Sequence, residues 1–264
     1  MPIIDCHVHT WSWAGFKPTA AGRDHWDRCL DWAEKLDVTY LTSCLRLSGD
    51  RIDSPNPTDL HTANAENQWI VERSRGRAFG LCFVNPRYTE ASLAEMEEWI
   101  GRRGFVGLKL HVALHCDQPE LDPLVAWCAA HRVPVCQHTW VKTNGNLPGE
   151  STPAMFRELA QRHPDAIMVM YHTGGDFVYG AKAAHGVDNI YCDLAGTDAV
   201  DGSVEALVNA VGADRVVFGS DLPGRALTSQ LAKVLGSSLS DIDKEKILYG
   251  NMARILAERK DHNP

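Results

Sequence analysis

Short apolar runs alternate with amphipathic segments eight times along this chain, and this alternation constrains its fold more than any other feature. The apolar runs predict strands at residues 3–9, 38–44, 78–85, 106–112, 134–140, 166–172, 189–195 and 216–221. Helical patterns are found at 24–36, 59–75, 90–102, 120–131, 152–162 and 202–211, and after the last strand at 228–235 and 241–260. Alternation at roughly 25–40 residues per unit is typical of a barrel in which each strand is followed by a helix. The sequence therefore predicts an α/β protein, a closed (β/α)8 barrel that forms a single domain over residues 1–264.

Local patterns support this prediction. Leu93, Met96 and Trp99 fall at three-residue steps and mark one apolar face of an expected helix. The run at 216–218 is apolar without alternation, as expected for a parallel strand that helices cover. The alternative is a doubly wound open sheet. The glycine-rich turn that is typical of dinucleotide-binding sheets does not follow the first strand, where Thr-Trp-Ser-Trp occupies 10–13.

Composition and charge argue against several classes of protein. The chain has 264 residues, a formal net charge of −8 and a pI near 5.8. A nucleic-acid-binding protein needs a basic face, so we expect no nucleic-acid partner. No apolar run approaches the roughly 20 residues of a membrane span, and the N-terminus shows no export signal, so we expect a cytoplasmic protein without membrane contact. The eight cysteines include no Cys-x-x-Cys pair, which argues against a zinc ribbon or a disulfide framework.

Histidine, lysine and aspartate residues, which can bind metals or transfer protons, lie at the ends of several of the expected strands. In a (β/α)8 barrel the active site lies at the carboxyl ends of the strands. The residues expected at this rim are His7, His9, Lys109, His111, His138, His172 and Asp221. Their convergence predicts an active site there.

The His-x-His pair of the first strand indicates a metal site. Alternate residues of a strand face the same side, so His7 and His9 both point into the barrel and can bind one ion. His138 and Asp221 would complete a set of three nitrogens and one oxygen that suits Zn²⁺, Mn²⁺ or Fe²⁺. We therefore predict a divalent metal cofactor, zinc first, with manganese or iron as alternatives. The ion would activate a water molecule, and Asp221 or His172 would take its proton.

Five motifs, in a fixed order, resemble those of a known family. They are Asp-Cys-His-Val-His at 5–9, Pro-Val-Cys-Gln before His138, His-Thr-Gly-Gly at 172–175, Gly-Ser-Asp-Leu-Pro at 219–223 and Gly-Asn-Met-Ala-Arg-Ile-Leu at 250–256. Over nearly its whole length the chain resembles the amidohydrolase superfamily, in particular the amidohydrolase-related branch that includes the aminocarboxymuconate semialdehyde decarboxylases.

The resemblance carries expectations of its own. It implies a TIM barrel with a metal ion held by His7, His9, His138 and Asp221. It also implies that His172 is an acid/base beside the metal or a ligand of a second ion. Barrels of this branch are often dimers or larger, so a homo-oligomer is possible and the oligomeric state stays open.

Two features leave alternatives open. In two-metal members of the superfamily a carboxylated lysine near the end of the fourth strand bridges the ions. Lys109 is the only lysine on the expected fourth strand, and His111 lies on the same face two residues nearer to the rim, so either is a candidate second-metal or substrate residue. Lys109 could instead pair with Asp5 inside the barrel. Asp193 points either inward or outward, and an inward Asp193 would order a neighbouring histidine.

Clues to the substrate come from the loops. Arg46 follows the second strand and Arg225 the eighth, where a guanidinium group could bind a substrate carboxylate. Trp11, Trp13 and Trp140 flank the predicted rim and could form an apolar wall. Each of these residues could equally be an ordinary surface or packing residue. Together they favour a small organic acid, lactone or aromatic substrate.

These observations predict a metal-dependent hydrolase that acts on an ester, lactone or amide bond of a small molecule. The first alternative is a metal-dependent non-oxidative decarboxylase of an aromatic or muconate-type acid on the same barrel. Further alternatives are a metal-free lactonase and a non-catalytic barrel that binds a metal or a ligand. Carbon dioxide release would distinguish the decarboxylase, and metal content would distinguish the other two.

Overall fold

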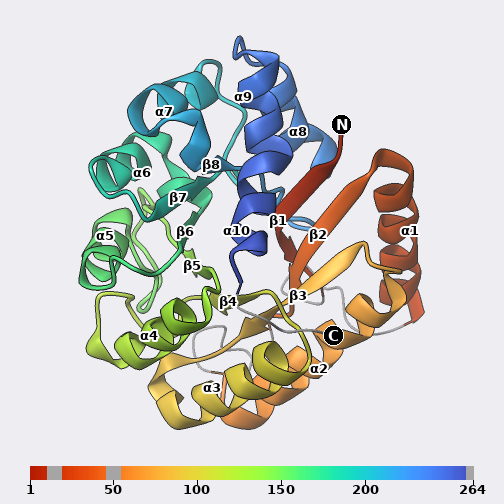
Figure 1. Cartoon of the computed structure of the whole chain (residues 1–264), viewed down its shortest axis with the longest axis vertical. Helices are drawn as coiled ribbons and strands as arrows, with labels where there is room; N and C mark the ends of the chain where they lie inside the picture. The colour runs from red at the N-terminus through yellow and green to blue at the C-terminus, as the bar shows by residue number, and fades with distance from the viewer. Residues whose placement is uncertain (11–19, 46–54, 260–264) are drawn as a thin grey trace.

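A closed barrel of parallel strands organises the molecule (Figure 1). The structure is a computed structural model that describes residues 1–10, 20–45 and 55–259, and the side chains within these ranges except those of 20–23. Its strands are β1 (Ile3–His9), β2 (Val38–Ser43), β3 (Ala78–Phe83), β4 (Gly107–Leu110), β5 (Val135–His138), β6 (Met168–Tyr171), β7 (Ile190–Asp193) and β8 (Val216–Val217). They form one parallel sheet in chain order. The amide of Cys6 donates to the carbonyl of Phe218 (2.9 Å) and that of Asp221 to the carbonyl of His7 (2.8 Å), so β1 closes against the chain that follows β8.

Helices surround this barrel, as Figure 1 shows. They are α1 (Ala20–Leu36), α2 (Pro57–Arg73), α3 (Thr89–Met96), α4 (Asp122–His131), α5 (Pro153–Arg162), α6 (Phe177–Ala184), α7 (Ser203–Val211), α8 (Leu227–Leu235), α9 (Asp241–Glu245) and α10 (Asn251–Ala257). Short 3-10 or π segments are η1 (Pro86–Tyr88), η2 (Glu97–Arg102), η3 (Pro119–Leu121), η4 (His172–Gly175), η5 (Ala213–Arg215) and η6 (Lys246–Gly250). This is the predicted (β/α)8 TIM barrel.

Side chains on the two faces of each strand build two layers of core. Leu108 and Val135, for example, face outward and pack in the layer between the strands and the helices. Leu41, Leu81 and Cys136 face inward and fill the barrel itself. The barrel interior is therefore a packed core, and the polar site lies at the end of this core where the strands finish.

Several boundaries differ from the predicted ones. Helix α6 was not predicted; its sequence Phe-Val-Tyr-Gly-Ala-Lys-Ala-Ala is only eight residues long, contains a glycine and has one charged side chain. Its Gly180 lies so close to Thr173 that a Cβ would be 2.3 Å from the Thr173 carbonyl oxygen, which explains the glycine in the helix. Strand β8 is shorter than predicted, since its ladder with β7 covers only Val216 and Val217. The chain continues along β1 through hydrogen bonds of Phe218 and Asp221, and Asp221 itself has a left-handed φ of +63°.

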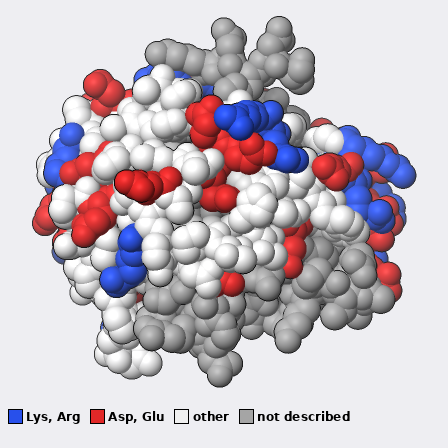
Figure 2. All heavy atoms as spheres, turned by 90° about the horizontal axis from the view of Figure 1, so that it is seen from below, with Lys and Arg blue, Asp and Glu red and all other residues white. Residues whose placement is uncertain are grey.

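The distribution of surface charge and the character of the helices agree with what the composition of the chain predicts. On the face shown in Figure 2, acidic and basic side chains are interspersed over the described residues. Within the described ranges, no helix combines the length and the apolar character needed to cross a membrane.

Candidate active site

Three predicted residues meet where β1 and β8 finish. His7 and His9 both lie on the inner face of β1 and are buried, as their spacing predicts. Asp221 follows β8, and its left-handed backbone conformation is one that aspartate adopts more readily than most residues. Its Oδ1 lies 3.8 Å from His7 Nε2 and 3.5 Å from His9 Nε2, while the two Nε2 atoms are 3.1 Å apart. Ligand atoms of the three residues all fall within 4.8 Å of one another.

Hydrogen bonds on the far side of each imidazole orient the two rings. Asp193 Oδ2 lies 2.7 Å from His7 Nδ1, and Ser43 Oγ lies 3.0 Å from His9 Nδ1. Because the Asp193 carboxylate only accepts, His7 carries its proton on Nδ1 and presents the lone pair of Nε2 to the cluster. Asp193 thus points inward and orders a histidine, one of the two alternatives that the sequence left open.

The chemistry of this cluster fits a divalent ion. Two imidazole nitrogens and a carboxylate oxygen are donors that Zn²⁺, Mn²⁺ and Fe²⁺ accept, and a histidine backed by a carboxylate is typical of metal sites. Burial, aided by the charge of Lys109, lowers the pKa of both His7 and His9 well below the usual value. The neutral imidazole that metal binding requires is therefore the form that this site favours.

His172 lies beside the cluster in a fixed orientation. Its ring centroid is 4.6 Å from that of His7, and its Nδ1 donates to the carbonyl oxygen of Ala195 over 3.1 Å. A carbonyl can only accept, so Nε2 is the ring nitrogen left for chemistry. The loop that supplies this carbonyl approaches closely, because a Cβ on Gly196 would lie 2.4 Å from His172 Nδ1.

His138, the fourth predicted ligand, has a partner that sequence reasoning missed. Its ring is close to that of His172 (4.7 Å between centroids), but its Nε2 lies 2.9 Å from Glu150 Oε1. Glu150 is buried and also accepts from Lys142 Nζ. A single acidic residue in the loop between β5 and α5 carries no periodic signal, so the sequence offered nothing to place it. His138 lies outside the cluster of His7, His9 and Asp221, and its role as a ligand stays a prediction.

Lys109 and His111 occupy different environments. His111 lines the active-site cavity and its Nδ1 has no hydrogen-bond partner among the described residues. Lys109 is fully buried, its Nζ lies 4.1 Å from the centre of the Tyr171 ring, and burial lowers its pKa to about 8. Its Nζ likewise has no hydrogen-bond partner in the described part of the chain, and it forms no ion pair with Asp5 there.

The cavity in front of the histidines has a volume of about 280 Å³. Trp140 and Arg225, two of the predicted substrate residues, line it together with His9, His138 and His172. Arg225 donates to the carbonyl of Gly224 and forms no ion pair with the described acidic residues. The third predicted substrate residue, Arg46, lies outside the described residues, as do Trp11 and Trp13.

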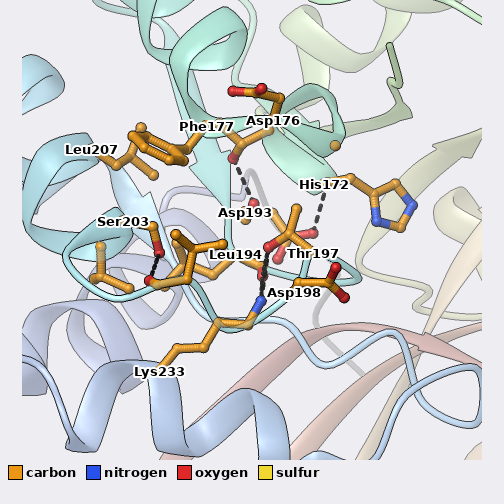
Figure 3. Close-up of a pocket in the computed structure, with 14 residues that line it drawn as sticks. His172, Asp176, Phe177, Asp193, Leu194, Thr197, Asp198, Ser203, Leu207 and Lys233 are labelled. Carbon is orange, nitrogen blue, oxygen red and sulfur yellow. Dashed lines mark hydrogen bonds between the residues drawn. The ribbon is translucent and has the colours of Figure 1, made fainter. Parts of the chain in front are cut away.

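A second cavity, of about 180 Å³, lies behind His172 between the loop after β7 and helices α7 and α8 (Figure 3). Lys233 of α8 lines it and is 9% exposed. Its Nζ donates to the Leu194 carbonyl and to Thr197 Oγ1, both over 2.8 Å. Lys233 therefore connects α8 to the loop whose Ala195 carbonyl orients His172, a role that sequence reasoning did not predict.

Comparisons with known proteins agree with the fold and the motifs. A family model described as amidohydrolase matches residues 4–257. A dihydroxybenzoic acid decarboxylase from Polaromonas sp. JS666, solved with bound manganese and the inhibitor 2-nitroresorcinol, has a TM-score of 0.78 at 17% identity, covering 99% of this chain and 98% of its own. The 5-carboxyvanillate decarboxylase of Sphingomonas paucimobilis has a TM-score of 0.74 at 14% identity, with 97% and 99% covered. The 4-oxalomesaconate hydratase of Rhodopseudomonas palustris has a TM-score of 0.66 at 17% identity, with 97% and 95% covered. At these identities the likeness shows a shared fold.

Proposed function

Because the chain belongs to the amidohydrolase family, and so to a family of enzymes that act on small molecules, we propose that it is a metal-dependent hydrolase of an ester, lactone or amide bond. The observation that carries the proposal is the buried convergence of His7, His9 and Asp221. These residues would hold the ion together with His138. We propose zinc, with manganese or iron as alternatives, since the donor set suits all three.

The residues around the cluster have separate roles in this proposal. When bound, the ion supplies Lewis acidity toward the carbonyl oxygen of the substrate. Asp221 takes the proton of the attacking water molecule. His172, with its Nδ1 proton directed at the Ala195 carbonyl, receives that proton on Nε2 and delivers it to the leaving group.

The cavity favours a small carboxylated substrate. Its volume of about 280 Å³ limits the size of the molecule. Arg225 offers a guanidinium group that forms no direct ion pair with a described carboxylate, and a planar guanidinium binds a carboxylate through two parallel hydrogen bonds. Trp140 supplies an apolar face against which a ring could pack.

Non-oxidative decarboxylation is the second candidate, and the structural neighbours favour it. Two of the similar structures are decarboxylases of hydroxylated aromatic acids, one of them with bound manganese. In this alternative Arg225 and the ion would orient the substrate carboxylate, and a protein acid would protonate the carbon atom that loses carbon dioxide.

Metal content and product identity test these proposals. After dialysis into metal-free buffer, we expect the protein to retain about one transition-metal ion per chain and the His9→Ala variant to lose it. His61→Ala is the matched control, because His61 lies on the outer helix α2, where it pairs with Glu95. Lactones, esters and amides are then assayed for carboxylate release, and hydroxylated benzoates for carbon dioxide. Hydrolysis that persists in a strong chelator, or equal metal content in all three proteins, would refute the metal-dependent proposal.

A further inference from the structure

A buried acidic residue lies behind the predicted fourth ligand. Glu150 is 2% exposed and sits at the end of the loop that joins β5 to α5. It accepts hydrogen bonds from His138 Nε2 (2.9 Å), from Lys142 Nζ on both oxygens (2.8 Å each) and from the amide of Leu147 (3.0 Å). An acid this deeply buried is stable as an anion only where such partners surround it.

The hydrogen bond to Glu150 determines which nitrogen of His138 can bind a cation. A carboxylate flanked by an ammonium group only accepts, so the His138 proton is on Nε2 and the lone pair is on Nδ1. His7 and His9 show the reverse arrangement, in which Nδ1 is hydrogen-bonded and Nε2 faces the cluster. A histidine whose far nitrogen donates to a carboxylate is a stronger and better-oriented ligand.

Glu150 also connects His138 to one wall of the cavity. Trp140, Lys142 and Leu147 line that cavity and belong to the same loop. The loop folds back on itself, since the Trp140 amide donates to the Ser151 carbonyl over 2.8 Å. The contacts of Glu150 with Lys142 and Leu147 hold this wall against the ring of His138.

We propose that Glu150 is a positioning residue that makes His138 Nδ1 the donor for the metal ion and couples ion binding to the order of the loop at 139–152. The inference rests on the proposed function, because it takes His138 as a ligand. It adds a residue that acts on the ion through His138 without contacting it.

A double-mutant cycle on metal affinity tests the proposal. The affinity of each protein for Zn²⁺ is measured by competition with a chromogenic chelator, and the Co²⁺-loaded proteins are compared by their visible spectra. We expect Glu150→Gln to bind Zn²⁺ about 10- to 100-fold more weakly and to change the Co²⁺ spectrum, with partial recovery in Glu150→Asp. In a His138→Ala background the Glu150→Gln change should have no further effect on affinity. Glu158→Gln is the matched control, because Glu158 is an exposed acid on α5 and the variant should bind as the native chain does.

A second measurement reports on the loop. Trypsin cleaves after lysine, and Lys142 is paired with Glu150 in the folded protein. We expect Glu150→Gln to be cut after Lys142 several-fold faster than the native chain, while thermal unfolding identifies any variant that has lost its fold.

The outcomes separate the two proposals. If His138→Ala weakens Zn²⁺ binding and Glu150→Gln does not, the role of Glu150 is refuted and the ligand set stands. Losses that add in the double variant would also refute it, because Glu150 would then act independently of His138. If His138→Ala leaves the affinity unchanged, the proposed ligand set fails and the inference fails with it.

Discussion

Replacing Gly196 with alanine is expected to reduce activity through His172 while leaving the metal site intact. Gly196 has a φ of +75°, a region that costs a residue with a Cβ about 1–2 kcal/mol. The new Cβ would also lie 2.4 Å from His172 Nδ1 and 3.2 Å from Asp221 Oδ2. The imidazole must withdraw by roughly 1 Å to restore ordinary van der Waals contact, which breaks its hydrogen bond to Ala195 at a cost of about 1 kcal/mol more.

The Gly186→Ala variant separates the conformational cost of a Cβ at positive φ from the cost of the clash with His172. Gly186 has a φ of +70°, and nothing lies within 4 Å of the position of a Cβ there. This variant should lose only the conformational part, about 1–2 kcal/mol, or roughly 2–8 °C in Tm. Gly196→Ala should lose about 1 kcal/mol more and, because the acid/base has moved by roughly 1 Å, about 100-fold in kcat.

Thermal unfolding measures the loss of stability. Turnover of whichever lactone, ester, amide or hydroxylated benzoate proves to be a substrate measures the loss of kcat, and elemental analysis measures the metal content. Both variants should retain the metal. A Cβ at position 186 meets no atom within 4 Å, and a Cβ at position 196 would lie 3.2 Å from Asp221 Oδ2, a contact that a shift of a few tenths of an ångström relieves. The reasoning is refuted if the two variants lose the same stability and Gly196→Ala keeps native kcat. Equal losses would mean that the loop after β7 moves away freely and does not orient His172.

Three further predictions concern single side chains. Asp221→Asn should abolish turnover with circular dichroism and Tm close to native, and residual activity above about 1% would contradict its role as proton acceptor. Burial lowers the pKa of Lys233 from 10.5 to about 8, so between about pH 8 and 10.5 the unfolded chain holds a proton that the folded chain has lost. The contribution of Lys233 to the free energy of unfolding therefore rises by up to about 3 kcal/mol over this window, and urea titrations should show a flatter profile for Lys233→Met than for the native chain. Arg225→Met should raise KM for a carboxylated substrate at least 10-fold with little change in kcat, and an unchanged KM would remove Arg225 from the substrate site.

The sequence predicted those parts of the molecule that depend on periodicity. The barrel followed from apolar runs of strand length separated by helical patterns, and the inward direction of His7 and His9 followed from the two-residue repeat of a strand. Helix α6 was not predicted; it has only eight residues, with a glycine in its middle and a single charged side chain, Lys182. A short helix of this kind is defined by its packing against Thr173, which is a tertiary contact.

The parts of the site that lie in loops could not be predicted in this way. Glu150 comes 12 residues after His138, and only the folded path of the loop brings the two side chains within 2.9 Å. Lys233 contacts Leu194 and Thr197 from a helix that follows the next strand, so it is equally remote in sequence. The predicted strand at 189–195 left the direction of Asp193 open, and the structure shows that only Ile190–Asp193 form it, with Asp193 as the last residue.

The acceptor that holds His172 is a peptide oxygen, and this has a consequence for how the site responds to mutation. Every amino acid placed at position 195 brings the same carbonyl group, so mutagenesis of this fully buried position reports how the new side chain packs and leaves the acceptor of His172 in place. Only a change to the main chain itself, such as an ester or thioamide linkage introduced between residues 195 and 196 by protein semisynthesis, would weaken the acceptor. The protonation state of the proposed acid/base is thus protected from side-chain variation at residue 195 in a way that the other histidines, which rely on Asp193, Ser43 and Glu150, are not.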